Sequence, residues 1–162
     1  MIQAAHLAPS CFNNQPWRFV AIDEPRMLGS LYPALGSSNG WMRHSPVILA
    51  VASHRDLDCR SSDGRDYFAF DCGLALGMLV IQAWHMGYVA HPVAGYKPRA
   101  IKKLLGIPDD YTLITLVNIG RKGDDHSLLD ADQRERETGP RVRRPLTEVL
   151  SWNRFEQSPS PP

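Results

Sequence analysis

The residues with the clearest chemical potential lie in a short polar segment near the amino terminus, APSCFNNQPWRF, from Ala8 to Phe19. It mixes hydrogen-bonding side chains with flat apolar ones, namely Ser10, Phe12, Asn13, Asn14, Gln15, Pro16 and Trp17. A flat heteroaromatic ligand needs this mixture, because ring edges take hydrogen bonds and ring faces take apolar cover. A plain connection between a helix and a strand, with polar groups capping the backbone, explains the same composition equally well. The segment alone leaves both interpretations open.

Other common chemistries find little support in the sequence. The six histidines are scattered, and no HExxH or CxxC pattern offers metal-ligand spacing. No GxGxxG follows an expected strand, and GRKG at 120–123 lacks the length and the Ser or Thr of a phosphate-binding loop. Cys11 has no evident base, so we favour a small loop residue over a nucleophile. His91 fits a surface or packed ring better than an acid or base. We therefore expect no metal and no catalytic side chain.

Strands and helices are expected to alternate around the polar segment. Short β-branched and aromatic runs predict strands at 17–22, 47–52, 88–93 and 112–119. Capping and proline signals predict helices at 1–7, 24–35 and 97–105. The run 67–87 is too long for a strand and apolar on nearly every face, which is typical of a helix buried all round, and in a small chain this indicates a partner subunit. The order predicts an α+β fold with this long helix packed on the sheet.

Length, charge and cysteine use limit the possible classes. The 162 residues, 43% hydrophobic and 22% charged, suit one domain over 1–162, with a charged solvated loop at 124–140, a C-terminal arm at 141–157 and a frayed tail at 158–162. A net charge of +1 gives no pull toward nucleic acid or anionic membranes. No apolar run long enough for a bilayer and no leader pattern is found. Cys11, Cys59 and Cys72 cannot all pair and lack the density of a disulfide scaffold, which favours a reducing cytoplasm.

Taken together, the motifs resemble the nitroreductase family of FMN-dependent enzymes. APSCFNNQPWRFV is similar to the family pattern in which APS, an Asn three residues after the Ser, and QPW before a strand form one wall of the FMN pocket. The segment 71–92 is similar to the family's central helix at the dimer interface, and HPVAGY at 91–96 to the turn that faces the flavin N5. The segment 105–120 resembles the LGIP turn and last core strand, and 141–155 the basic segment and C-terminal arm. The resemblance covers most of residues 1–155.

The resemblance implies a flavin site assembled from three segments. The residues implied to touch the isoalloxazine ring, in this family often from the neighbouring subunit, are Pro9, Ser10, Cys11 and Asn13. The residues implied to line the reactive edge of the ring are Pro92, Val93, Ala94 and Gly95. The Ala94 N–H is the implied partner of the flavin N5. Arg141 and Arg143 would bind the phosphate, because guanidinium groups match phosphate oxygens, with a solvated run of charge as the alternative.

The fold and activity implied by the resemblance are equally specific. It implies an α+β three-layer sandwich with a mixed or antiparallel sheet, and a homodimer paired through the helices at 67–87. The cofactor would be FMN, and NADH or NADPH the co-substrate. A small oxidised acceptor such as a nitroaromatic or a quinone would be reduced by a ping-pong mechanism.

One departure from the family pattern concerns the start of the chain. Family members usually begin earlier, with a helix and an Arg-Arg-Ser-type motif that holds the FMN phosphate and ribityl chain. This sequence has no counterpart, so we expect either a truncated sequence or an impaired flavin site, since each lost charge-assisted bond costs about 1.5–3 kcal/mol. The alternative function is therefore a flavin-binding or structural dimer without turnover. A smaller departure is Met78, where relatives often carry a polar residue.

Overall fold

The structure, a computed structural model, describes residues 1–155. The expected tail at 158–162 and the last two residues of the arm at 141–157 lie outside the described residues. The chain divides into two compact units, residues 1–128 and the segment that begins at Leu129, and each is described by itself. The single domain expected from the length stays a prediction.

The first unit is built on a four-stranded antiparallel sheet in the order β1-β2-β4-β3. Its strands are β1 (Arg18–Ile22), β2 (Val47–Ser53), β3 (Val89–Val93) and β4 (Thr112–Gly120). All four were expected, and each observed end lies within one residue of the expected one. A register shift at Val51 and Ala52 interrupts the β2–β4 pairing near the end of β2.

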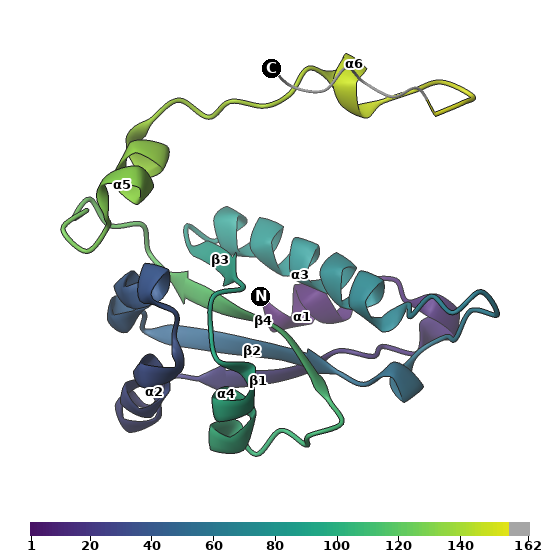
Figure 1. Ribbon diagram of the computed structural model, residues 1–162, viewed down its shortest axis with the longest axis horizontal. Coiled ribbons are helices and arrows are strands. Elements are labelled where there is room, and N and C mark those ends of the chain that lie inside the picture. The colour runs from purple at the N-terminus through teal and green to yellow at the C-terminus, as the bar shows by residue number, and fades with distance from the viewer. Residues whose placement is uncertain (156–162) are drawn as a thin grey trace. The chain divides into compact units, whose positions relative to one another are not determined.

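Helices cover both faces of this sheet (Figure 1), which confirms the α+β three-layer sandwich. The helices of the unit are α1 (Ile2–His6), α2 (Pro25–Leu31), α3 (Phe68–His85) and α4 (Pro98–Leu105). Alternate residues of β2 face opposite cores, as the period of a strand requires. Ile48 and Ala50 pack in a core that includes residues of α2 and α4, whereas Leu49 and Val51 pack with residues of α1 and α3. Both faces of the central strand are therefore buried.

The helix expected at 24–35 is shorter than expected. It ends at Leu31 and continues as a 3-10 turn, Tyr32–Ala34. Pro33 explains the change, because a proline has no N–H for the α-helical ladder and disfavours helical geometry at the residue before it. A second 3-10 segment, Ser37–His44, leads into β2 and was not expected.

Within this chain the long helix α3 is buried on one face only, and the expected burial of its other face by a partner subunit stays a prediction. Its inward residues are Asp71, Cys72, Ala75, Leu79 and Ala83. Its outward face keeps large apolar side chains in the open, with Phe70 56%, Ile81 72% and Trp84 76% exposed. By length and composition α3 could cross a membrane, but its inner face forms the core against the sheet.

In the described part of the second unit, up to residue 155, there are two helices, α5 (Ala131–Thr138) and α6 (Leu146–Val149). The first of these corrects the charged loop expected at 124–140. Asp130 and Gln133 form a capping box, in which the Asp130 carboxylate accepts from the Gln133 N–H at 2.8 Å and the Gln133 side chain accepts from the Asp130 N–H at 3.2 Å. The pattern D-x-x-Q is a helix-start signal that does not depend on apolar periodicity.

Candidate functional site

The polar segment at 8–19 forms a tight turn between α1 and β1. It contains one 3-10 turn, Cys11–Asn13, and three non-glycine residues in the left-handed region, Phe12 at φ 48°, Asn13 at φ 58° and Gln15 at φ 50°. An L-residue in this region costs about 1–2 kcal/mol relative to its right-handed conformation. The turn therefore holds a conformation that the local sequence disfavours, and contacts must impose it.

Hydrogen bonds from the turn to itself and to α3 supply part of this constraint. The Gln15 N–H donates to Ser10 Oγ at 2.9 Å, and the Gln15 side chain donates to the Asn13 carbonyl at 2.6 Å. The Cys11 N–H donates to the Asp71 carboxylate of α3 at 2.7 Å. Three of the four residues implied to touch a flavin thus have a structural role in the turn as well.

A disulfide between Cys11 and Cys59 supplies the remaining constraint, and the cysteine count did not single out this pair. The two residues are 48 positions apart in sequence, and their Cα atoms lie 6.1 Å apart. Cys72 is the one free cysteine, and burial raises the pKa of its thiol to about 11. From the sequence we favoured a reducing cytoplasm and a small loop residue at position 11, and we assigned no pairing. Only the approach of two distant loops makes this pair possible.

Two buried carboxyl groups, Asp58 and Asp71, lie behind the turn and were missed by the sequence reasoning. Asp71 is 1% exposed, and burial raises the pKa of its carboxyl, with a smaller contribution from the negative Asp58. The hydrogen bond from Cys11 acts in the opposite direction. Asp58 accepts from the Cys59 N–H at 2.8 Å through Oδ1, whereas its buried Oδ2 has no partner among the described residues. An aspartate inside the apolar run of α3 was the available signal, since such a residue is seldom fully buried without a partner.

The apolar residues of the turn divide into core and surface. Pro16 and Trp17 are buried, so they cannot cover a ligand ring, and the indole N–H of Trp17 donates to His6 Nδ1 at 3.2 Å. Phe12 is 92% exposed, and Pro9 and Asn13 are also exposed. The surface available to a ligand is therefore Pro9 to Asn13.

The second segment, Pro92 to Gly95, leaves the end of β3 as an exposed bend. Val93 is buried, whereas Pro92, Ala94 and Gly95 are exposed. The Gly95 carbonyl accepts from the Gly36 N–H at 2.7 Å and from the Asn39 side chain at 2.8 Å. Gly36 and Asn39, in the segment GSSNG, were not singled out in the sequence, because their role depends on contact with a bend some 60 residues later.

The bend also determines the surroundings of His91. The ring of His91 packs edge-on against Trp41, with ring centroids 5.2 Å apart. This agrees with the surface or packed ring that was favoured over an acid or base.

The two segments start from opposite edges of the sheet. The turn precedes β1 and the bend follows β3, and these are the first and last strands in the order β1-β2-β4-β3. Three strand spacings separate the edges, about 14 Å. Each group of implied flavin residues is thus brought together within itself, but the two groups lie apart within one chain.

Arg141 and Arg143 lie in the second unit and are exposed. One guanidinium N–H of Arg143 donates to the neighbouring Val142 carbonyl at 3.0 Å. Their implied role toward a phosphate stays a prediction.

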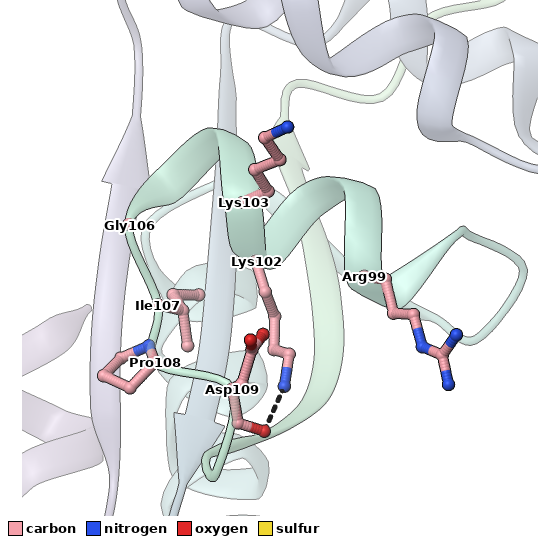
Figure 2. A pocket seen from close by; sticks show the side chains of 7 residues that line it. All are labelled: Arg99, Lys102, Lys103, Gly106, Ile107, Pro108 and Asp109. Atoms are coloured by element: carbon pink, nitrogen blue, oxygen red, sulfur yellow. Dashed lines mark hydrogen bonds between the residues drawn. The ribbon is translucent and has the colours of Figure 1, made fainter.

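A separate depression of about 770 Å³ lies at the C-terminal end of α4 (Figure 2). It is lined by Arg99, Lys102, Lys103, Gly106, Ile107, Pro108 and Asp109. The Lys102 ammonium donates to the carbonyls of Asp109 at 2.8 Å and Tyr111 at 3.0 Å, while the side chains of Arg99 and Lys103 point in other directions than that of Lys102 (Figure 2). We do not place the functional site in this depression, because the Lys102 ammonium is bonded to the backbone and none of the residues implied to bind a flavin lines it.

One group of metal-type side chains occurs among residues 1–155. The ligand atoms of Cys11, Asp58 and Cys59 lie within 4.8 Å of one another. The two sulfur atoms are joined to each other, and zinc binds thiolates rather than a disulfide. In the disulfide-bonded state, Cys11 and Cys59 therefore do not serve as metal ligands.

Comparison with known proteins identifies the family of this chain. The model of the Nitroreductase family matches residues 24–121. A protein of Archaeoglobus fulgidus, provisionally named NADH dehydrogenase/NAD(P)H nitroreductase, is 28% identical over 139 residues, 83% of this chain and 77% of its own length. A solved structure described as an oxidoreductase containing FMN is 34% identical, with a TM-score of 0.77 over 97% of this chain and 80% of its own.

A second solved structure supports the fold alone. A provisionally named nitroreductase from Exiguobacterium sibiricum, in complex with FMN, is 24% identical with a TM-score of 0.77 and covers 94% of this chain and 83% of its own. The matched family model spans more than half of the chain and includes all of α2 to β4. The chain belongs to the nitroreductase family.

Proposed function

We propose that this protein is an FMN-dependent oxidoreductase that uses NADH or NADPH to reduce a small oxidised acceptor. The observation that carries the proposal is the pair of exposed, tightly held segments at 9–13 and 92–95, on which the family's flavin-contact pattern falls. The FMN named for related solved structures agrees with it. The physiological acceptor is a nitroaromatic, a quinone or a similar small molecule.

The chemical groups of the two segments fit a flavin. Phe12 and Pro9 offer apolar surface for a ring face, and Asn13 offers an exposed amide for a ring edge. Ala94 and Gly95 present exposed backbone that has no bulky side chain, so a flat ring can approach closely. A rigid site of this kind holds its ligand at a low cost in ordering, because its loops are already fixed by internal bonds.

We propose that two chains complete each site, which requires a homodimer. The outward face of α3 carries Phe70, Ile81 and Trp84 around Gly73 and Gly77, where nothing lies within 4 Å of an added Cβ. Large apolar groups around small residues allow two helices to approach closely. Burying side chains of this size contributes about 1.5–3 kcal/mol each. A two-fold axis at α3 would let the turn of one copy meet the bend of the other, since within one chain they start from opposite sheet edges.

The bound cofactor would take two electrons from NAD(P)H and then pass them to the acceptor, which is the basis of a ping-pong mechanism. The protein's residues position and tune rather than react. The Ala94 N–H would donate toward the flavin N5, and the turn at 9–13 would cover the ring and exclude water. Arg141 and Arg143 would pair with the phosphate, where guanidinium groups form charge-assisted bonds.

The proposal is tested on the purified protein. We expect one flavin per chain, by absorbance or after FMN titration, and oxidation of NADH or NADPH that depends on a quinone or nitroaromatic acceptor. Bound flavin without turnover would instead support a flavin-binding dimer, and a protein that ignores added FMN would refute the enzyme. The cytoplasmic location expected from the sequence stays a prediction.

The dimer is tested separately by sedimentation. Ile81→Arg adds a charge to the open face of α3 and should convert dimer to monomer and lower FMN affinity together. Ala100→Arg, at an exposed position of α4, is the matched control and should change neither. Full FMN affinity in a monomeric Ile81→Arg protein would contradict a site shared between two chains.

A further inference from the structure

The disulfide between Cys11 and Cys59 links the turn at 8–19 to the loop between β2 and α3, residues 54–67. We propose that this pair is a reversible redox clasp, which when oxidised holds the turn in its flavin-binding conformation and when reduced releases it. The inference rests on the proposed function for its effect on FMN. Its effect on the turn itself is independent of any cofactor.

The loop that carries Cys59 has few other connections to the turn. Its arginines pair with aspartates of the same loop, Arg55 with Asp66, Arg60 with Asp56 and Arg65 with Asp63, and these pairs are exposed. His54 lies 3.8 Å from Asp56 in this loop and 3.8 Å from Asp110, which is not part of the turn. Asn14 reaches across with two long hydrogen bonds, to Asp58 Oδ1 at 3.4 Å and to Cys59 Sγ at 3.5 Å. Bonds of this length are weak. The covalent link is therefore the main tie between the two loops.

The turn depends on such a tie because of its backbone. Phe12, Asn13 and Gln15 all have positive φ, a conformation that persists only where the surroundings enforce it. Without the disulfide, the Cys11 N–H bond to Asp71 and the Gln15 N–H bond to Ser10 remain. The other bonds that remain are short-range ones inside the turn, from the Gln15 side chain to the Asn13 carbonyl and from the Asn13 and Asn14 N–H groups to the Ser10 and Cys11 carbonyls. Because all of these bonds except the one to Asp71 lie within the turn, losing the covalent link would let Phe12 and the implied flavin contact Asn13 leave the left-handed region more often.

The surroundings of the clasp can accommodate both redox states. Asp58 is 9% exposed, and its buried Oδ2 has no hydrogen-bond partner among the described residues. Its carboxylate lies within 4.8 Å of both sulfur atoms. Reduction creates two S–H donors beside this acceptor, and a buried acceptor normally has a donor.

Reduction and reoxidation require a small thiol or disulfide from outside. Cys11 and Cys59 are both partly exposed. A thiolate of a small dithiol attacks one sulfur, the S–S bond breaks, and the second thiol of the reagent displaces the mixed disulfide. Two electrons and two protons pass to Cys11 and Cys59, and the reagent leaves as a cyclic disulfide. A small disulfide reverses the sequence and leaves as two thiols.

The experiment compares the oxidised and the dithiothreitol-reduced full-length protein, first without FMN. Alkylation and intact mass should count one free thiol after oxidation and three after denaturing reduction. Hydrogen exchange in peptides covering 8–19 should become at least tenfold faster on native reduction, with β4 unchanged as a sign of an intact fold. Cys72→Ala should respond like the wild type, and Cys59→Ser should exchange fast in both conditions.

FMN titration then separates the clasp from the cofactor. We expect the dissociation constant for FMN to rise about tenfold on reduction of the wild type, and to be insensitive to redox state in Cys59→Ser. If neither state binds FMN, the proposed function fails, and the exchange data still decide on the clasp. Three free thiols after oxidation, equal exchange of the turn in both states, or equal FMN affinity in both states would overturn the redox clasp.

Discussion

Replacing Gly36 with alanine tests how closely the bend after β3 is held by the segment that precedes the 3-10 stretch Ser37–His44. A Cβ at position 36 would lie 2.8 Å from the Gly95 carbonyl oxygen and 3.1 Å from its carbon. The backbone of Gly36, at φ −66°, is one that alanine adopts readily, so any effect comes from the contact and not from backbone strain. Since the obstacle is backbone, no side-chain rotation can relieve it.

The cost follows from the geometry around Gly95. Ordinary contact begins near 3.4 Å, so the two backbones must separate by about 0.6 Å, which stretches the 2.7 Å bond from the Gly36 N–H. A weakened hydrogen bond costs about 1 kcal/mol, and overpacking of a filled site about 1–3 kcal/mol. We expect a loss of about 2–4 kcal/mol in the free energy of unfolding, and a fall of roughly 5–15 °C in the melting temperature.

Urea denaturation and a thermal melt measure this loss, and FMN titration measures its effect on the bend. Moving Ala94 and Gly95 should weaken FMN by about tenfold, the equivalent of 1.4 kcal/mol. Gly29→Ala is the matched control, because Gly29 is exposed in α2 and has nothing within 4 Å of an added Cβ. That substitution should stabilise by about 0.5–1 kcal/mol through helix propensity. A Gly36→Ala protein within 0.5 kcal/mol of wild type, by the same melts, would refute the close-approach argument.

Three further substitutions test other parts of the structure. In the folded protein the pKa of the Asp71 carboxyl is raised, so above pH 3.8 the folded protein binds more protons than the unfolded chain and its stability falls as pH rises. Asp71→Asn should remove this fall. Urea melts from pH 4 to 7 in which the free energy of unfolding changes equally with pH in both proteins would contradict it. Replacing Arg141 and Arg143 together with alanine should weaken FMN at least tenfold while the dimer persists in sedimentation, and unchanged affinity would remove the phosphate assignment. Asp130→Ala breaks the capping box with Gln133 and should cost α5 about 1 kcal/mol, visible as faster hydrogen exchange at 131–138, whereas unchanged exchange would show that the cap is not needed.

The elements of the first unit were largely predictable because their signals are local. A strand such as β4 is a run of β-branched residues, and α4 has Pro98 at its start and Gly106 in the left-handed region just after its end. These preferences come from the backbone of each residue and its near neighbours. The prediction of a loop at 124–140 was wrong for a related reason. Helix α5 has no buried residue and therefore no apolar periodicity, so its capping box is the only sequence signal of a helix there.

The candidate site was predictable in part. The motif residues from Pro9 to Asn13 and from Pro92 to Gly95 do form two exposed, well-held segments, as expected of a ligand site. The groups that hold them were not foreseen. Asp58, Asp71 and Cys59 fix the turn, and Gly36 and Asn39 fix the bend. Such supporting residues have no sequence pattern of their own, because their function is defined by the partner they touch.

By itself the sequence determined the order of the strands and main helices of the first unit and the family, since these depend on side-chain type at short spacing. Tertiary structure alone decided which cysteines pair, which glycine meets the Gly95 carbonyl and which face of α3 stays open. Each of those depends on the distance between residues far apart in the chain. Chain folding sets that distance, and composition and local periodicity carry no information about it.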